Sequence, residues 1–126
     1  MIHMKKESID RDKKITVSIP VRVQIQLLQL FRVAIRNYRA LAQTHECKRQ
    51  NLQDACDFVE FFKRCIKNDK TDFEFGLSRT LDLCHAISQA LSVKPRPNDY
   101  PREAFLSGEF LLDTLQVKRE LVLRGK

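Results

Sequence analysis

The sequence predicts an all-α, single-domain bundle of four or five helices with a short extended N-terminal arm. The length of 126 residues suits one domain with a core of its own. Apolar residues recur at helical spacing over most of the chain. Three glycines and four prolines are too few for a many-stranded β fold. We therefore divide the chain into a charged, partly flexible arm, residues 1–19, and a helical bundle, residues 20–126.

The last residues of the arm could adopt either of two conformations. Residues 15–19, ITVSI, alternate apolar and polar side chains and are rich in β-branched residues. This pattern predicts either one short strand or an extended lead-in to the first helix. Pro20 follows and suits the first turn of a helix.

The stretch from Val21 to His45 predicts the longest helix of the chain, with two contrasting faces. Its apolar stripe comprises Leu27, Leu28, Phe31, Ala34, Ile35, Tyr38, Leu41 and Ala42. Its polar stripe comprises Arg22, Gln26, Gln29, Arg32, Arg36, Arg39 and Gln43. The polar stripe carries arginines and amides but no acid, and no other stretch is so one-sided.

Three further helical regions complete the predicted bundle. Asn51 is a candidate N-cap for a helix from about Leu52 to Lys67. Thr71 and Glu74 form a candidate capping box that opens a helix from about Asp72 to Leu91, with Leu81 on its inner side. Residues 93–101 hold three prolines and predict a loop. The last helical region covers Arg102 to Leu123, and Gly108 could divide it.

The positive charge is concentrated in one part of the sequence. The net charge is +7, and residues 13–45 contain six basic residues and no acid. The other segments are close to neutral. A localised basic stripe favours a polyanionic partner more than a diffuse excess would. The candidate nucleic-acid-binding residues are Lys13, Lys14, Arg22, Arg32, Arg36 and Arg39.

The arginines of the first helix admit three interpretations. Arg32, Arg36 and Arg39 lie at i, i+4 and i+7, so their guanidinium groups could follow a phosphate backbone with bidentate contacts. They could instead form a solvated face, or pair with acids of the second helix across the bundle. They could also meet an acidic protein partner.

Arg79 and His85 form the pattern R-x5-H within the third predicted helix. This resembles the R-x(4–6)-H signature of HEPN domains, which are small helical ribonucleases. The resemblance implies an RNase in which Arg79 and His85 act on the scissile phosphate, with Asp82 orienting His85. The family usually has a polar Asn or Asp after the arginine, whereas Thr80 follows here.

Two other patterns suggest alternatives. The segment ITVSIP before an apolar helix resembles the opening of ribbon-helix-helix DNA-binding proteins, in which Thr16 and Ser18 would enter the major groove from a dimeric ribbon. His45, Cys47, Cys84 and His85 could supply zinc ligands, but their spacing differs from that of structural zinc sites. We therefore expect no metal and no cofactor.

Residues 20–124 resemble, in profile alone, the small subunit of multi-subunit CRISPR RNA-guided effector complexes. The features that carry this resemblance are size, helical content, one basic face and surplus apolar faces. It implies a non-catalytic, sequence-independent nucleic-acid-binding subunit of a ribonucleoprotein assembly, with other subunits and several copies of itself as partners. An HEPN-like ribonuclease and a protein-interaction adaptor are the alternative functions.

Location follows from what the sequence lacks. The most apolar stretch, around residues 25–35, is interrupted by Gln26, Gln29 and Arg32, so no membrane span is expected. The N-terminal residues lack the apolar core of a signal peptide. The expected location is therefore cytoplasmic, with reduced cysteines.

Overall fold

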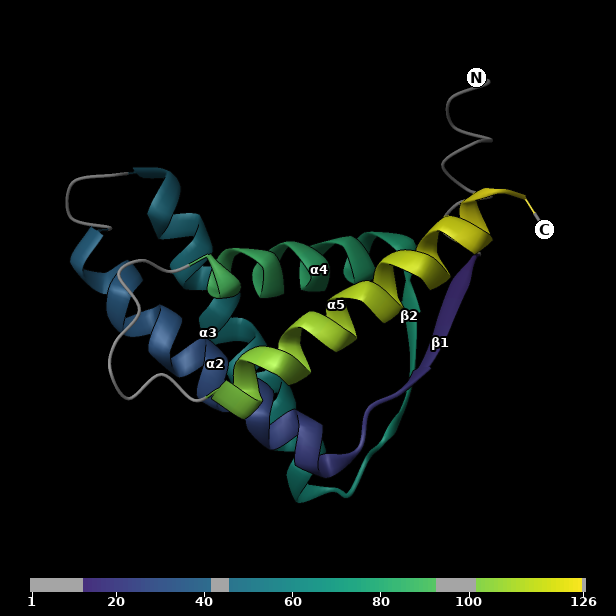
Figure 1. Ribbon diagram of the computed structural model, residues 1–126, viewed down its shortest axis with the longest axis horizontal. Coiled ribbons are helices and arrows are strands. Elements are labelled where there is room, and N and C mark those ends of the chain that lie inside the picture. The colour runs from purple at the N-terminus through teal and green to yellow at the C-terminus, as the bar shows by residue number, and fades with distance from the viewer. Residues whose placement is uncertain (1–12, 42–45, 93–101, 126) are drawn as a thin grey trace.

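The computed structural model describes residues 13–41, 46–92 and 102–125. Four helices surround one core, and a short two-stranded sheet lies beside them (Figure 1). The elements, in chain order, are β1 (Lys14–Ser18), α2 (Val21–Leu41), α3 (Glu46–Lys67), β2 (Asp72–Gly76), α4 (Leu77–Leu91) and α5 (Arg102–Leu123). The predicted single helical bundle is confirmed. The predicted loop at 93–101 lies outside the described residues.

The short strand offered as one alternative for residues 15–19 is confirmed as β1, whereas its partner β2 was not predicted. Residues 72–76, DFEFG, form strand β2 rather than the first turn of a helix, so the predicted capping box from Thr71 to Glu74 is wrong. Phe73 and Phe75 alternate with exposed acids, which is the period of a strand with one buried face. Helix α4 therefore begins at Leu77, five residues later than predicted.

Strand β1 is part of the core. It pairs antiparallel with β2, and Ile15 and Val17 lie opposite Phe75 and Phe73. Ile15, Val17 and Ile19 are buried. The last residues of the predicted arm, 1–19, therefore pack in the same core as the helical bundle. Because β1 pairs with a strand of its own chain, the structure differs from a ribbon-helix-helix protein, in which the ribbon joins two subunits.

Phenylalanines bind the sheet to the helices. Phe73 and Phe75 stack with ring centroids 5.4 Å apart. Phe61 of α3 contacts both rings, at 6.0 and 6.2 Å. Phe62 joins Phe61, at 5.1 Å, to Phe58, at 6.4 Å. Phe58 in turn stacks on Phe31 of α2, with centroids 6.1 Å apart. Aromatic side chains bury large areas, and such ring pairs add about 0.5–1.5 kcal/mol each beyond that burial.

Gln24 joins the start of α2 to the turn before β2. Its side chain is fully buried, and Nε2 donates to the carbonyl oxygens of Ile19, at 2.8 Å, and Lys70, at 2.6 Å. The backbone N–H of Ile19 donates to the carbonyl oxygen of Thr71, at 2.8 Å. Buried amides are stabilised by such bonds, so this corner fixes the direction in which α2 leaves the sheet.

Helix α2 contacts all three other described helices, α3, α4 and α5. Helix α3 begins at Glu46, six residues before the predicted Leu52. Leu81 of α4 was expected to face inward, but its side chain is 50% exposed. The side chains of α4 that face the core include Leu83, Cys84 and Ile87.

Helix α5 runs without a break through Gly108. Gly108 is where α5 approaches α2 and α4 closely: a Cβ atom there would lie 2.8 Å from Cδ2 of Leu30 and 3.3 Å from Cδ2 of Leu91. The glycine therefore permits close helix packing. None of the described helices is both long enough and apolar enough to cross a lipid bilayer.

Replacing Gly108 with leucine should force α5 away from α2. Overpacking of this kind costs about 1–3 kcal/mol. Urea denaturation should therefore show Gly108→Leu to be less stable than wild type by that amount. Gln116→Leu adds the same side chain to an exposed position of α5 and should stay within about 0.5 kcal/mol. Equal stability of the two variants would contradict this packing.

Candidate nucleic-acid interface

The exposed side chains of α2 form a single ridge along the helix. Side chains buried against the other elements occupy most of the circumference of α2. The exposed ones recur at alternating steps of three and four residues, which keeps them on one narrow strip of the helix. We define this arginine ridge as Arg22, Ile25, Gln29, Arg32, Arg36 and Arg39.

Arg32, Arg36 and Arg39 give the ridge its charge. From Arg32 to Arg39 the helix rises about 10 Å, so the three guanidinium groups follow one short line. None of the three forms an ion pair with any residue that the structure describes. Within the part of the chain that the structure describes, no acid competes with a ligand for their donors. A guanidinium presents five N–H donors in a planar fork that matches a phosphate.

The acids of α3 whose side chains are described, Asp54, Asp57 and Glu60, form no ion pair with the ridge. Asp54 and Asp57 accept hydrogen bonds of 2.8 Å from Gln50 and Gln53, one turn earlier on α3. Glu60 pairs with Lys63 of the same helix at 3.6 Å. These acids thus have partners on their own helix surface. The interpretation in which they pair with the α2 arginines across the bundle has no support among the described residues.

Gln26 is not on the ridge, although the sequence placed it on the polar stripe. Its side chain is buried between α2 and α5, where it accepts a hydrogen bond from Ser107 Oγ. Gln26 Nε2 donates to Glu103 Oε2 at 3.4 Å. Helical spacing alone could not distinguish this amide from Gln29, because only the position of α5 determines which one is covered.

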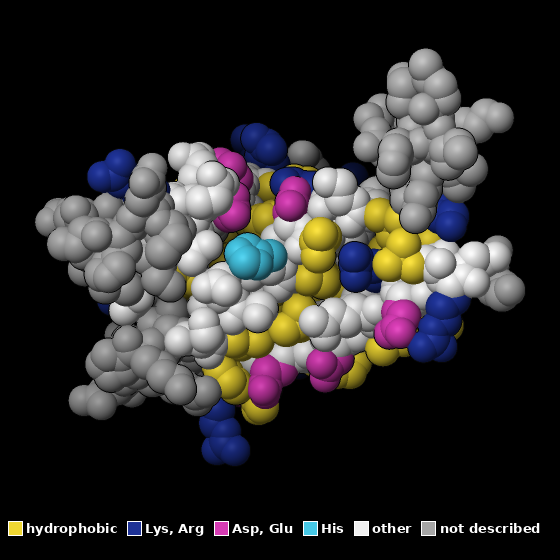
Figure 2. Space-filling model, turned by 90° about the horizontal axis from the view of Figure 1, so that it is seen from above, with side chains coloured by type: hydrophobic (Ala, Val, Ile, Leu, Met, Phe, Trp, Pro, Cys, Tyr) yellow, Lys and Arg dark blue, Asp and Glu magenta, His cyan; other side chains and the backbone are white. Residues whose placement is uncertain are grey.

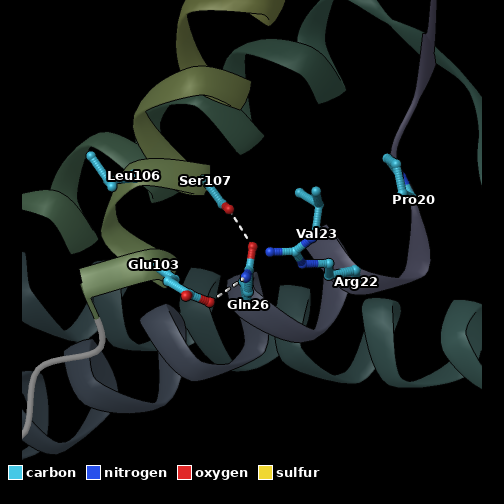
Figure 3. A pocket seen from close by; sticks show the side chains of 7 residues that line it. All are labelled: Pro20, Arg22, Val23, Gln26, Glu103, Leu106 and Ser107. Carbon is cyan, nitrogen blue, oxygen red and sulfur yellow. Dashed lines mark hydrogen bonds between the residues drawn. The ribbon is translucent and has the colours of Figure 1, made fainter.

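A hollow of about 470 Å³ lies beside Gln26, at the start of the arginine ridge. It is lined by Pro20, Arg22, Val23, Gln26, Glu103, Leu106 and Ser107 (Figure 3). The side chain of Arg22 points toward Gln26, across from Glu103. Arg22 therefore belongs to both the ridge and the hollow, and an acid of α5 lies at the same opening.

The structure separates the two predicted lysines from the arginines. Lys13 and Lys14 precede and begin β1, and Lys14 lies near Gly76 at the start of α4. Strand β1 extends from the start of α2 to the far end of the molecule (Figure 1). Its first residue, Lys14, therefore lies roughly 16 Å from Ile19. The candidate residues therefore form an arginine ridge with a distant pair of lysines, rather than one patch.

The R-x5-H pattern lies on α4, but its arginine is engaged in packing. The Arg79 guanidinium carbon lies 4.4 Å from the centroid of Phe58 and 5.3 Å from that of Phe61. His85 is exposed further along the helix. The face above α4 mixes basic, acidic and apolar side chains, without a dominant charge (Figure 2). The cation–π contacts of Arg79 with Phe58 and Phe61 stabilise the packing of α4 against α3.

The described residues form no group of three or more His, Cys, Asp or Glu side chains suited to a metal. Of the four candidate zinc ligands, His45 and the side chain of Cys47 lie outside what the structure describes. Cys84 is buried, and burial raises the pKa of its thiol. Burial also raises the pKa of the Cys65 thiol, despite the opposing charges of Lys70 and Arg64.

The cysteines should differ in their reaction with a thiol reagent. A raised pKa lowers the thiolate fraction at pH 8, and burial requires the core to open before reaction. Cys65 and Cys84 should react about tenfold or more slowly than the partly exposed Cys56, as followed by mass spectrometry of the labelled protein. Equal labelling rates in the folded protein would contradict the described core.

Comparisons with known proteins give no independent assignment. No protein-family model matches the chain. No significant match was found among curated proteins or among solved structures.

Proposed function

We propose that this protein is a non-catalytic subunit that binds nucleic acid through the arginine ridge, without sequence specificity. The observation that carries the proposal is the state of Arg32, Arg36 and Arg39. These three exposed cations lie in one line and have no acidic partner among the described residues. A solvated helix face usually carries charges of both signs, with ion pairs between successive turns.

The mechanism of binding is electrostatic. Each arginine would donate two N–H groups to a phosphate and release the counterions that this phosphate had condensed. Gln29 would add a neutral donor within the same strip. Phosphate contacts position a strand but carry no sequence information, so the protein should bind unrelated sequences with similar affinity.

We further propose that the protein works within a larger ribonucleoprotein assembly in the cytoplasm, as the resemblance to CRISPR small subunits implies. Exposed apolar side chains beyond the ridge support protein partners, because solvent-exposed residues such as Leu81 and Phe110 have no role in phosphate binding. Cys56, Cys65 and Cys84 are free thiols, which suits a reducing compartment.

Neutralising the ridge should reduce the salt dependence of binding. On duplex DNA each phosphate contact contributes about 0.9 to the magnitude of the slope of log K against log [salt]. The magnitude of this slope should therefore be smaller by roughly 2–3 in the Arg32/Arg36/Arg39→Gln variant than in the wild type. Fluorescence anisotropy with a labelled duplex, and with a single strand of RNA, over a range of salt concentrations measures it. Circular dichroism should show unchanged helix content, because all three residues are exposed.

A matched control is available on α3. Arg64 and Lys67 are also exposed and lie one turn apart, like Arg36 and Arg39. Arg64/Lys67→Gln should leave the slope nearly unchanged, whereas Arg36/Arg39→Gln should lower it. An equal loss from both pairs would show diffuse attraction and overturn the assignment of the ridge. Absence of binding at low salt would favour a protein adaptor, and RNA cleavage that depends on His85 would favour a ribonuclease.

A further inference from the structure

Helix α5 has a second apolar face, which points away from the bundle. Ala104, Gly108, Leu111 and Leu115 are buried against the other elements. On the opposite side, Leu106, Phe110, Val117 and Leu121 are exposed, and Phe110 is 75% exposed. Helix α5 lies on the outside of the bundle, nearest the viewer in Figure 1. Its outer face is therefore accessible along several turns.

The exposed residues of this face are arranged symmetrically about the middle of α5. Leu106 and Leu121 are equally far from the point between Asp113 and Thr114, and so are Phe110 and Val117. The same midpoint relates Glu103 to Arg124, which are of opposite charge. A helix surface with this symmetry is complementary to itself when two copies run antiparallel.

We propose that the outer face of α5 binds the same face of a second copy, in an antiparallel homodimer with twofold symmetry. The pattern places Leu106 level with Leu121 of the second copy, and Phe110 level with its Val117. Each apolar side chain thus meets another one. The proposal concerns a different surface from the arginine ridge and does not depend on nucleic-acid binding.

Other registers of the same two helices are less favourable. Sliding one helix by one turn in one direction places Phe110 level with Asp113 of the second copy, and Glu103 level with its Glu120. The opposite slide places Leu106 level with Gly125, where α5 has already ended. Only the central register matches all four exposed apolar residues and pairs Glu103 with Arg124.

The charges on this face favour protein over nucleic acid. The exposed acids Glu103, Glu109, Asp113 and Glu120 outnumber the exposed bases Arg102 and Arg124 in this part of the chain, so a phosphate backbone is disfavoured there. In the dimer, Arg124 would exchange its present partner Glu120, at 2.8 Å, for Glu103 of the second copy, or bridge both carboxylates. Because these ends lie about 30 Å apart on α5, the two ion pairs would fix the ends of the interface.

Disulfide trapping of two variants, each with one added surface cysteine, tests both the interface and its direction. The background is Cys47→Ser/Cys56→Ser, since Cys65 and Cys84 are buried. Leu106→Cys mixed with Leu121→Cys should give a crosslinked heterodimer under mild oxidation, because level residues of packed helices approach disulfide distance. Leu106→Cys alone should not crosslink, since its two copies would be about 22 Å apart.

The alternative results of this experiment are distinct. Crosslinking of Leu106→Cys with itself would indicate a parallel pair and overturn the proposal. Absence of crosslinking in the mixture, while the background protein also sediments as a monomer at high concentration, would overturn it as well.

Sedimentation velocity provides a second measurement with a matched control. Phe110→Glu places a charge in the centre of the face and should weaken dimerisation by about thirtyfold or more, as expected for a central interface residue. Leu81→Glu changes a similarly exposed apolar residue on α4 and should leave the dimer intact. Dissociation by both variants, or by neither, would contradict an interface on α5.

Discussion

The enclosure of α2 is the constraint on which the rest of the structure depends. Three helices contact it, and every apolar side chain from Leu27 to Tyr38 is buried. The buried amide of Gln24 fixes its start by hydrogen bonds to the carbonyls of Ile19 and Lys70. A helix enclosed in this way has only one strip left for polar residues, and here that strip carries the arginines. Their alignment is thus a consequence of packing.

The surroundings of this strip decide its chemistry. Among the acids of α3 whose side chains the structure describes, Asp54, Asp57 and Glu60 bond to neighbours on their own helix, and none forms an ion pair with the arginines of α2. On the other side, Gln26 is withdrawn into the contact with α5. Aligned cations that have no acidic partner among the described residues repel one another, and a bound polyanion would relieve that repulsion.

Periodicity predicted the long elements because burial imposes it over many turns. Helices α2 and α5 were predicted close to their observed bounds, and the exposed arginines followed from the same pattern. Short elements were harder. Phe73 and Phe75 alternate over only five residues, and a plausible capping box at Thr71 competed with the strand. Whether Gln26 and Leu81 are buried or exposed depends on which helix lies beside them, and no local sequence pattern contains that information.

The most direct test of the central claim is to observe the arginine side chains themselves during binding. Two-dimensional NMR of the Nε–Hε groups, recorded while a short single-stranded oligonucleotide is added, resolves individual arginines. We expect shifts at Arg32, Arg36 and Arg39 and little change at Arg64 and Arg102. Shifts confined to arginines outside α2, or no shift at low salt, would contradict it.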